Sequence, residues 1–282
     1  MLRILIAIVV LAAPRPALAW WDYGHRVIAS IAWAELTPAT RAEIAALLAA
    51  EADVATPTCP LASIEDASVW PDCIKTLGDR YSYAFSWHFQ NVDVCKPFDD
   101  RSACAGGNCV SAQIDRNARL LADRALPARV RLEAFAFLVH FIGDMHMPLH
   151  AGDRGDRGGN DVVASYGYIA GRTNLHLMWD GYLAERSITT PPGGPTGLLA
   201  GLGTADKAAI AAGSTRDWAR EAWAASRELA YAGLLGEACA PLPAERPVLR
   251  EAATRQLIPA VRQQVVRAGL RLARTLDAAL RT

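Results

Sequence analysis

An apolar stretch that carries two polar residues at helical spacing restricts the fold of this chain more than any other feature. In the run Ala136-Phe137-Leu138-Val139-His140-Phe141-Ile142-Gly143-Asp144, the residues His140 and Asp144 are four positions apart. This spacing puts both side chains on one face of a helix. Burying an imidazole and a carboxylate costs several kcal/mol unless they are paired or bound to a metal. The run therefore predicts a core helix with a polar site on one face.

A second pair of the same kind follows in the sequence. His176 and Asp180 repeat the four-residue spacing, and His150 comes just after the first helix. The chain has only 6 His, so this concentration is informative. Imidazole and carboxylate ligands without thiolates are typical of catalytic zinc sites. The alternative is a buried His–Asp hydrogen-bond network without a metal.

The apolar spacing elsewhere is also helical, and we find no internal repeat. Thr37-Pro38 is typical of a helix start, with a capping hydroxyl followed by proline. The segment 152–171 is rich in glycine and is expected to be irregular. The predicted helices are 27–36, 42–50, 66–75, 111–126, 129–146, 175–185, 206–232 and 249–280. The pattern predicts a single all-α domain.

The composition excludes several classes of protein. The chain is 52% hydrophobic and 21% charged, with 29 Lys+Arg balanced by 29 Asp+Glu. These values are those of a globular domain and exclude a disordered or collagen-like chain. A net charge of zero also argues against a surface patch of Lys and Arg as the main source of affinity for polyanions.

The first 19 residues have the pattern of a secretory signal peptide. A basic start, Met1-Leu2-Arg3, precedes an apolar run at 4–13 and the small residues of Ala17-Leu18-Ala19. We expect cleavage after Ala19, which leaves a domain at 20–282 that is secreted or periplasmic and has no membrane anchor. The 6 Cys should then oxidise. The alternative, a buried N-terminal helix, is disfavoured by Pro14 and Pro16.

Several separated motifs together resemble the S1/P1 nuclease family. They are Trp20-Trp21-Asp22-Tyr23-Gly24-His25, Trp70-Pro71-Asp72, Trp87-His88-Phe89, the run from His140 through Pro148-Leu149-His150, Gly158-Gly159-Asn160, and Asn174-Leu175-His176-Leu177-Met178-Trp179-Asp180. The resemblance implies a mainly helical single domain of the phospholipase C/P1 nuclease type. It also implies a trinuclear zinc site in a cleft.

The resemblance assigns nine residues to three zinc ions. The first ion is held by Asp72, His88, His140 and Asp144, and Asp144 also bridges to the second ion. The second ion is further held by His25 and by the α-amino nitrogen and carbonyl oxygen of Trp20. The third ion is held by His150, His176 and Asp180. Since the amine of Trp20 exists only after cleavage, the precursor should lack a complete cluster. His146 is the one His left over, and we expect it to face the substrate or to support a ligand; a structural role is the alternative.

The resemblance also implies roles for residues beside the metals. Asp72 would orient the attacking water, and Lys75 would stabilise the charged phosphoryl group; Lys75 as a solvated helix residue is the alternative. Phe89 would stack on a base, unless it belongs to the core, and Asn160 would contact the substrate. Asn91 stands where fungal members have Asp, so their base preference is not transferred.

The cysteines follow the same resemblance. It implies disulfides Cys104–Cys109 and Cys95–Cys239, which leaves Cys59 and Cys73 for a third. The function expected is that of a secreted, monomeric zinc endonuclease that cleaves single-stranded DNA and RNA to 5′-phosphate products and also acts on 3′-nucleotides. A zinc phospholipase C and a non-catalytic periplasmic zinc-binding protein are the alternatives, and the pair Phe89 and Asn91 favours the nuclease.

Overall fold

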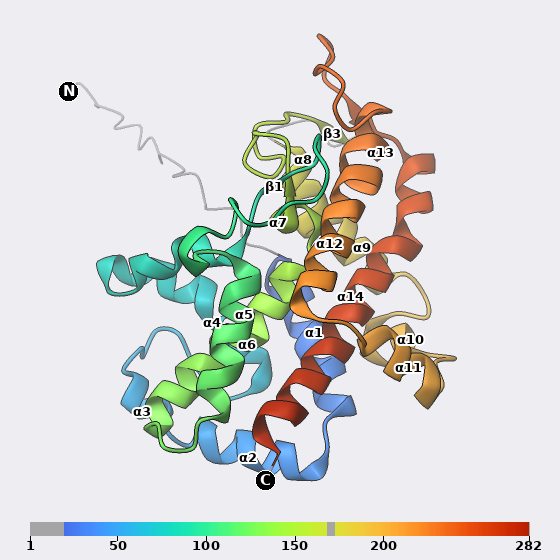
Figure 1. Cartoon of the computed structure of the whole chain (residues 1–282). Helices are drawn as coiled ribbons and strands as arrows, with labels where there is room; N and C mark the ends of the chain where they lie inside the picture. Colours follow the sequence, from blue (N-terminus) through green and yellow to red (C-terminus); the bar gives the residue numbers. More distant parts are fainter. Residues whose placement is uncertain (1–19, 168–172, 282) are drawn as a thin grey trace, which may run out of the picture.

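The fold is built around one buried helix, α6 (Ala128–Met145). The computed structural model describes residues 20–167 and 173–281, so the predicted signal peptide at 1–19 lies outside the described residues. From Ala134 onward every residue of α6 is buried. Because this part of the helix is buried on all sides, other elements must surround it. α5 (Val110–Ala122) and α4 (Ile64–Cys73) pack against it, as Figure 1 shows.

The first and the last helix of the described chain lie side by side. The long C-terminal helix α14 (Glu251–Leu280) runs along α1 (Asp22–Glu35) (Figure 1). Gly269 permits this contact, because a Cβ atom there would lie 2.3 Å from Cγ2 of Ile31. The packing holds α1, which carries the first metal-ligand candidates, against the core.

The remaining elements are short. They are α2 (Pro38–Leu48), α3 (Glu51–Val54), η1 (Ile74–His88), β1 (Val92–Asp93), η2 (Ala105–Gly107), α7 (Pro148–Ala151), β2 (Gly152–Asp153), β3 (Ser165–Tyr166), α8 (Leu175–Leu177), η3 (Met178–Leu183), α9 (Ala184–Thr189), α10 (Gly194–Leu199), α11 (Thr204–Ala211), α12 (Thr215–Ala225), η4 (Ser226–Tyr231), α13 (Ala232–Leu235) and β4 (Val248–Leu249). The strands form two parallel pairs, β1 with β2 and β3 with β4. The predicted all-α class is confirmed.

Several predicted helix boundaries are corrected by local turns. The predicted start at Thr37 is confirmed, because its hydroxyl accepts the N–H of Thr40. The predicted helix 206–232 is wrong as one element: Gly213 has φ +96°, and Ser214 starts α12 with a capping box. The predicted helix 111–126 ends at Ala122, since the carboxylate of Asp123 accepts a backbone N–H in the following turn. Helical spacing persists in these segments, but the turns interrupt it.

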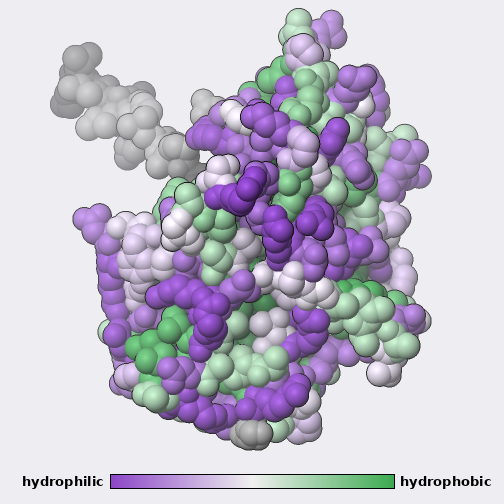
Figure 2. Space-filling model, in the orientation of Figure 1, coloured by the Kyte–Doolittle hydropathy of each residue, from purple (hydrophilic) through white to green (hydrophobic). Residues whose placement is uncertain are grey.

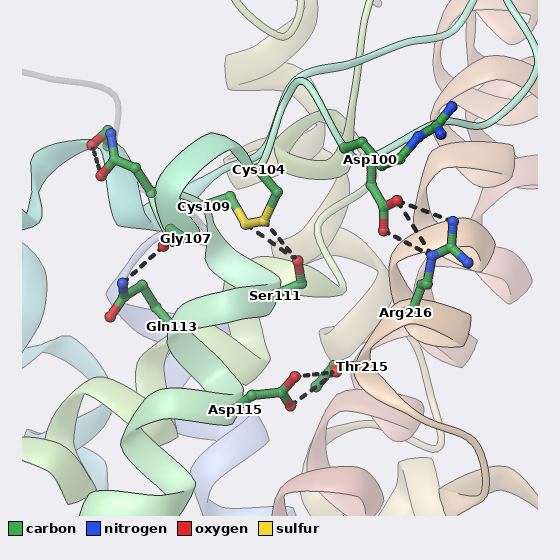
Figure 3. Close-up of a disulfide and its surroundings, with 12 residues drawn as sticks. Asp100, Cys104, Gly107, Cys109, Ser111, Gln113, Asp115, Thr215 and Arg216 are labelled. Atoms are coloured by element: carbon green, nitrogen blue, oxygen red, sulfur yellow. Dashed lines mark hydrogen bonds and ion pairs between the residues drawn. A yellow bond between two sulfur atoms is a disulfide. The ribbon is translucent and has the colours of Figure 1, made fainter.

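All three expected disulfides are present. Cys59–Cys73, Cys95–Cys239 and Cys104–Cys109 account for every cysteine in the chain. Figure 3 shows Cys104–Cys109 at the start of α5, beside the hydroxyl of Ser111. Nearby, Asp100 pairs with Arg216 and Asp115 accepts from Thr215, so side chains join this region to α12 (Figure 3).

The surface is mixed in character. Hydrophilic and hydrophobic side chains alternate over the face seen in Figure 2. Within residues 20–167 and 173–281, no helix combines the length and the apolar character needed to cross a bilayer.

Candidate metal centre

The polar face of α6 is the base of the site. His140 and Asp144 are fully buried, and Nε2 of His140 lies 3.0 Å from Oδ2 of Asp144. His88, the last residue of η1, brings its Nδ1 to within 2.9 Å of the same oxygen. The four-residue spacing therefore does place both α6 side chains in one site, as the sequence predicts.

Asp72 completes a first group of donors. It comes from α4, and its Oδ1 lies 3.7 Å from both Nδ1 of His88 and Nε2 of His140. The donor atoms of Asp72, His88 and His140 all lie within 4.8 Å of one another. That separation suits side chains that share one metal ion.

His25 of α1 forms a second group with His140 and Asp144. Its Nε2 lies 3.4 Å from Oδ1 of Asp144, and its ring stacks on that of His140 with centroids 4.1 Å apart. Gly143 makes room for the ring, because a Cβ atom at position 143 would lie 2.7 Å from Nδ1 of His25. The sequence Gly143-Asp144 thus supplies both a ligand and the space for its neighbour.

The third group joins α7 to the segment formed by α8 and η3. It consists of His150, His176 and Asp180, with Nε2 of His176 3.7 Å from Oδ2 of Asp180. Trp20 approaches this group: its backbone nitrogen donates to Oδ1 of Asp180, while its buried indole donates to the carbonyl of Gly143 at 2.8 Å. The residue expected to supply the N-terminal ligand therefore lies at the centre.

Three of the histidines are oriented by backbone carbonyls. Each ring donates through Nδ1–H, because a carbonyl oxygen can only accept. The pairs are His140 with Ser68 at 2.7 Å, His150 with His88 at 2.8 Å and His176 with Gly158 at 2.8 Å. This arrangement fixes the tautomer with the proton on Nδ1, so that the lone pair of Nε2 can bind a metal, as in histidines that are metal ligands.

Several buried polar atoms in the centre have no hydrogen-bond partner within the described residues. They are both ring nitrogens of His25, Oδ1 of Asp144 and Oδ2 of Asp180. Unpaired polar atoms at this depth are costly, and cations bound in these clusters would satisfy Nε2 of His25 and the two carboxylate oxygens, while Nδ1 of His25 faces Gly143. Nitrogen and oxygen donors without sulfur fit zinc. The residues therefore fit the group that the sequence leads us to expect.

The protonation of the histidines is set by burial. It lowers the pKa of His88 and His150 to about 4 and that of His176 to about 3. All three are therefore neutral at pH 7, which is the form that binds a metal.

The pKa values of Asp72 and Asp180 are shifted in opposite directions. Burial alone would raise the pKa of Asp72, but His140 and Lys75 hold it at about 2. Burial raises the pKa of Asp180 well above its usual value. A cation bound at Asp180 would favour the ionised form instead.

A cavity of about 310 Å³ opens above the centre. It is lined by Lys75, Phe85, His88, Phe89, Asn91, Leu149, His150, Arg157, Asn160 and His176. Lys75 lies 2.5 Å from Oδ1 of Asp72, so it is in contact with the centre. The four residues predicted beside the metals, Lys75, Phe89, Asn91 and Asn160, thus line one cavity with three predicted ligands.

Sequence reasoning missed three residues of this cavity, Phe85, Leu149 and Arg157. Arg157 precedes Gly158-Gly159-Asn160 directly, and its φ of +57° is uncommon for a residue other than glycine. Its guanidinium pairs with Asp161 on the surface. Phe85 lies in an aromatic run before His88, which was the available signal.

His146 is not at the cavity, so the expectation that it faces the substrate is wrong. Its Nδ1 donates to the carbonyl of Ile142 at 2.7 Å, and its Nε2 accepts from Arg271 at 2.9 Å. Burial and the charge of Arg271 lower its pKa to about 3. Because His146 follows the end of α6, its ring turns toward α14. Both ring nitrogens are thereby used away from the metal ligands.

A helical fold with three clusters of buried His and Asp beside a cleft is that of a protein whose side chains could hold metal ions. The chain belongs to the S1/P1 nuclease family, whose model matches residues 20–281. The resemblance found in the motifs is thereby confirmed.

Individual relatives are similar over part of their length. Endonuclease 3 of Arabidopsis thaliana is 28% identical over 180 residues, covering 62% of this chain and 58% of the relative. Nuclease P1 of Penicillium citrinum is 29% identical over 174 residues, or 60% of each chain. Nuclease S1 of Aspergillus oryzae is 27% identical over 186 residues, which are 64% of this chain and 60% of the relative. The chain thus spans about three-fifths of the length of these relatives.

Proposed function

We propose that this protein is a zinc-dependent endonuclease that hydrolyses single-stranded DNA and RNA to 5′-phosphate products and also removes phosphate from 3′-nucleotides. The observation that carries the proposal is the single cavity in which Lys75 and Phe89 lie above three of the buried histidines. A cation and an aromatic ring are what a phosphodiester and its base require. The family membership supports the same activity.

The zinc ions would number three. The proposed ligands are the three clusters already described, together with the amine and carbonyl of Trp20 and with Asp144 as the bridge between two ions. When bound, zinc lowers the pKa of water and stabilises both the attacking and the leaving oxygen of the phosphodiester.

Asp72 and Lys75 would act on the reacting group. With its pKa held at about 2, Asp72 is a carboxylate at neutral pH and can accept a hydrogen bond from the attacking water, which fixes its direction. The ammonium of Lys75, 2.5 Å from Asp72, can neutralise charge that develops on the phosphoryl oxygens. The 3′ oxygen leaves, so that the phosphate remains on the 5′ end of the product.

Recognition of the substrate would rest on three residues of the cavity. Phe89 offers a ring for stacking, which tolerates any base. Asn91 has φ +48°, a conformation that asparagine tolerates well, and its amide can both donate and accept. The side-chain amide of Asn160 donates a hydrogen bond to the carbonyl of Arg157. When substrate binds, this amide would rotate to contact it.

Export would complete the centre. Cleavage after Ala19 would convert the backbone nitrogen of Trp20, which already contacts Asp180, into a free amine. The domain at 20–282 would then act as a monomer in the periplasm or the medium.

One comparison tests the proposal against its alternatives. A single zinc-loaded preparation is offered single-stranded DNA, RNA and phosphatidylcholine. We expect both nucleic acids to be cleaved to 5′-phosphates and the lipid to remain intact. Hydrolysis of the lipid alone would identify a phospholipase C, and no hydrolysis at all would indicate a zinc-binding protein without activity.

A further inference from the structure

The apolar side chain of Phe85 is exposed to solvent. At 60% exposure it is the most exposed large hydrophobic residue in the described part of the chain. Single exposed apolar residues are common on protein surfaces, but an exposed aromatic ring that lines a cavity can serve binding. The neighbouring aromatics on η1 differ: Tyr83 packs edge-on against Trp87, with centroids 5.1 Å apart. Phe85 therefore needs an explanation other than packing.

The position of Phe85 gives that explanation. It lines the cavity above the metal centre, and together with Lys75 it also lines an adjoining cavity of about 270 Å³. The second cavity is completed by Gly78, Tyr81 and Ser82. A Cβ atom at Gly78 would meet nothing within 4 Å, so this wall is open. Phe85 thus lies between the metal centre and a further space that opens beside it.

The ring also contacts a charged group of the site. The ammonium of Lys75 lies 5.7 Å from the centroid of Phe85, within the range of a cation–π interaction. The same ammonium contacts Asp72. A group held by Lys75 therefore lies near both the ring of Phe85 and the metal centre.

We infer that Phe85 is a stacking platform for the base on the 3′ side of the scissile phosphate. The inference rests on the proposed function, in which Lys75 contacts the phosphoryl group under attack. That phosphoryl group belongs, as a 5′-phosphate, to the nucleotide on the 3′ side. The base of this nucleotide therefore lies near Lys75, where Phe85 offers the exposed ring, while Phe89 takes the base on the 5′ side. The cleft holds two successive bases, one on each ring.

The test varies the ring and the base separately. The wild type, Phe85→Ala, Phe85→Trp and the control Tyr83→Ala are compared. Tyr83 is on the same helix and is 52% exposed, but it is not among the residues lining either cavity. Each zinc-loaded protein receives a dinucleotide, the same dinucleotide with an abasic 3′ residue, and a 3′-mononucleotide.

The expected result is confined to one substrate. Since stacking of a base is worth roughly 1–3 kcal/mol, Phe85→Ala should raise KM for the complete dinucleotide about tenfold with kcat little changed. Its KM for the abasic dinucleotide and the 3′-mononucleotide should equal that of the wild type. Phe85→Trp should restore the KM for the complete dinucleotide, and Tyr83→Ala should match the wild type on all three substrates.

Two results would overturn the inference while leaving the proposed function intact. One is an equal fall in kcat on all three substrates, which would mean that Phe85 only positions Lys75. The other is an unchanged KM of Phe85→Ala for the complete dinucleotide. A wild type that cleaves none of the substrates would instead refute the proposed function, and the inference with it.

Discussion

Gly143 and His25 are so close that the main chain of α6 forms one wall of the imidazole site. A Cβ atom at position 143 would lie 2.7 Å from Nδ1 of His25 and 2.9 Å from its Cε1. Both atoms belong to a rigid ring that also stacks on His140. The ring cannot yield without moving away from Asp144, so the position admits only glycine.

Substitution of Gly143 should disrupt the metal centre by displacing a buried side chain. We expect Gly143→Ala to displace His25 and to lower both zinc content and activity by at least tenfold. Gly233→Ala is the matched control, because the nearest atom to its new Cβ atom would be 3.9 Å away. Elemental analysis and a nuclease assay measure zinc content and activity in both variants. Normal zinc content in Gly143→Ala would show that the ring of His25 has room to move.

The number of ions follows from the three clusters of donors. Protein purified with zinc should contain about three ions per chain. Elemental analysis after removal of loosely bound metal provides the measurement. A value of one ion or fewer would contradict the assignment of three clusters.

Substitutions of Asp144 and of Lys75 should differ in their effects on metal content and turnover. Asp144→Asn removes a buried charge that lies next to His25 of one donor cluster and His88 of another, so metal content and turnover should fall together. Lys75→Ala leaves every proposed ligand in place, so zinc content should stay normal while kcat falls about 100-fold, the usual size of a lost electrostatic contact. Equal small losses of kcat in both variants, with metal content unchanged, would argue against these roles.

The metal-free protein should be sensitive to acid. His88, His150 and His176 have folded-state pKa values of about 4, 4 and 3, below the ordinary value of 6.5. Between pH 6.5 and pH 4 the unfolded chain therefore binds more protons, and stability falls as the pH falls. The raised pKa values of His140 and Asp180 offset only part of this difference. Urea unfolding of chelator-treated protein should show a lower midpoint at pH 5 than at pH 7, and equal midpoints would contradict the assignment.

The N-terminus provides a further test. A form with one extra residue, such as Met before Trp20, would move the amine ~3.8 Å along the chain, more than a Zn–N bond of ~2.0–2.1 Å. We expect this form to fold but to bind less zinc and to lose most of its nuclease activity. Removal of the extra residue by an aminopeptidase should restore both. Three zinc ions and full activity in the extended form would mean that Trp20 is merely packed.

The sequence was most informative where local geometry decides the outcome. The spacing of His140 and Asp144 sufficed to predict a polar site on a buried helix, because four residues make about one turn. The identities of Asp72, His88 and His25 as neighbours depended on the family motifs, since nothing local brings three separate segments together. Their proximity in the structure agrees with that ligand set.

Tertiary properties were beyond the sequence. Phe85 looks like any other aromatic in its run, and only the structure reveals that its ring is exposed beside Lys75. His146 lies between ligands in the sequence, yet the helix end turns it toward Arg271. In both cases the direction of a side chain is set by elements distant in the chain.

His88 connects two donor clusters through different atoms. Its ring lies with Asp72 and His140, while its backbone carbonyl receives the Nδ1–H of His150 in another cluster. An ion that immobilises the ring of His88 therefore also steadies the peptide group to which His150 is bonded. Binding of one metal ion therefore orders part of the neighbouring site. We expect metal binding by this protein to be cooperative rather than a series of independent events.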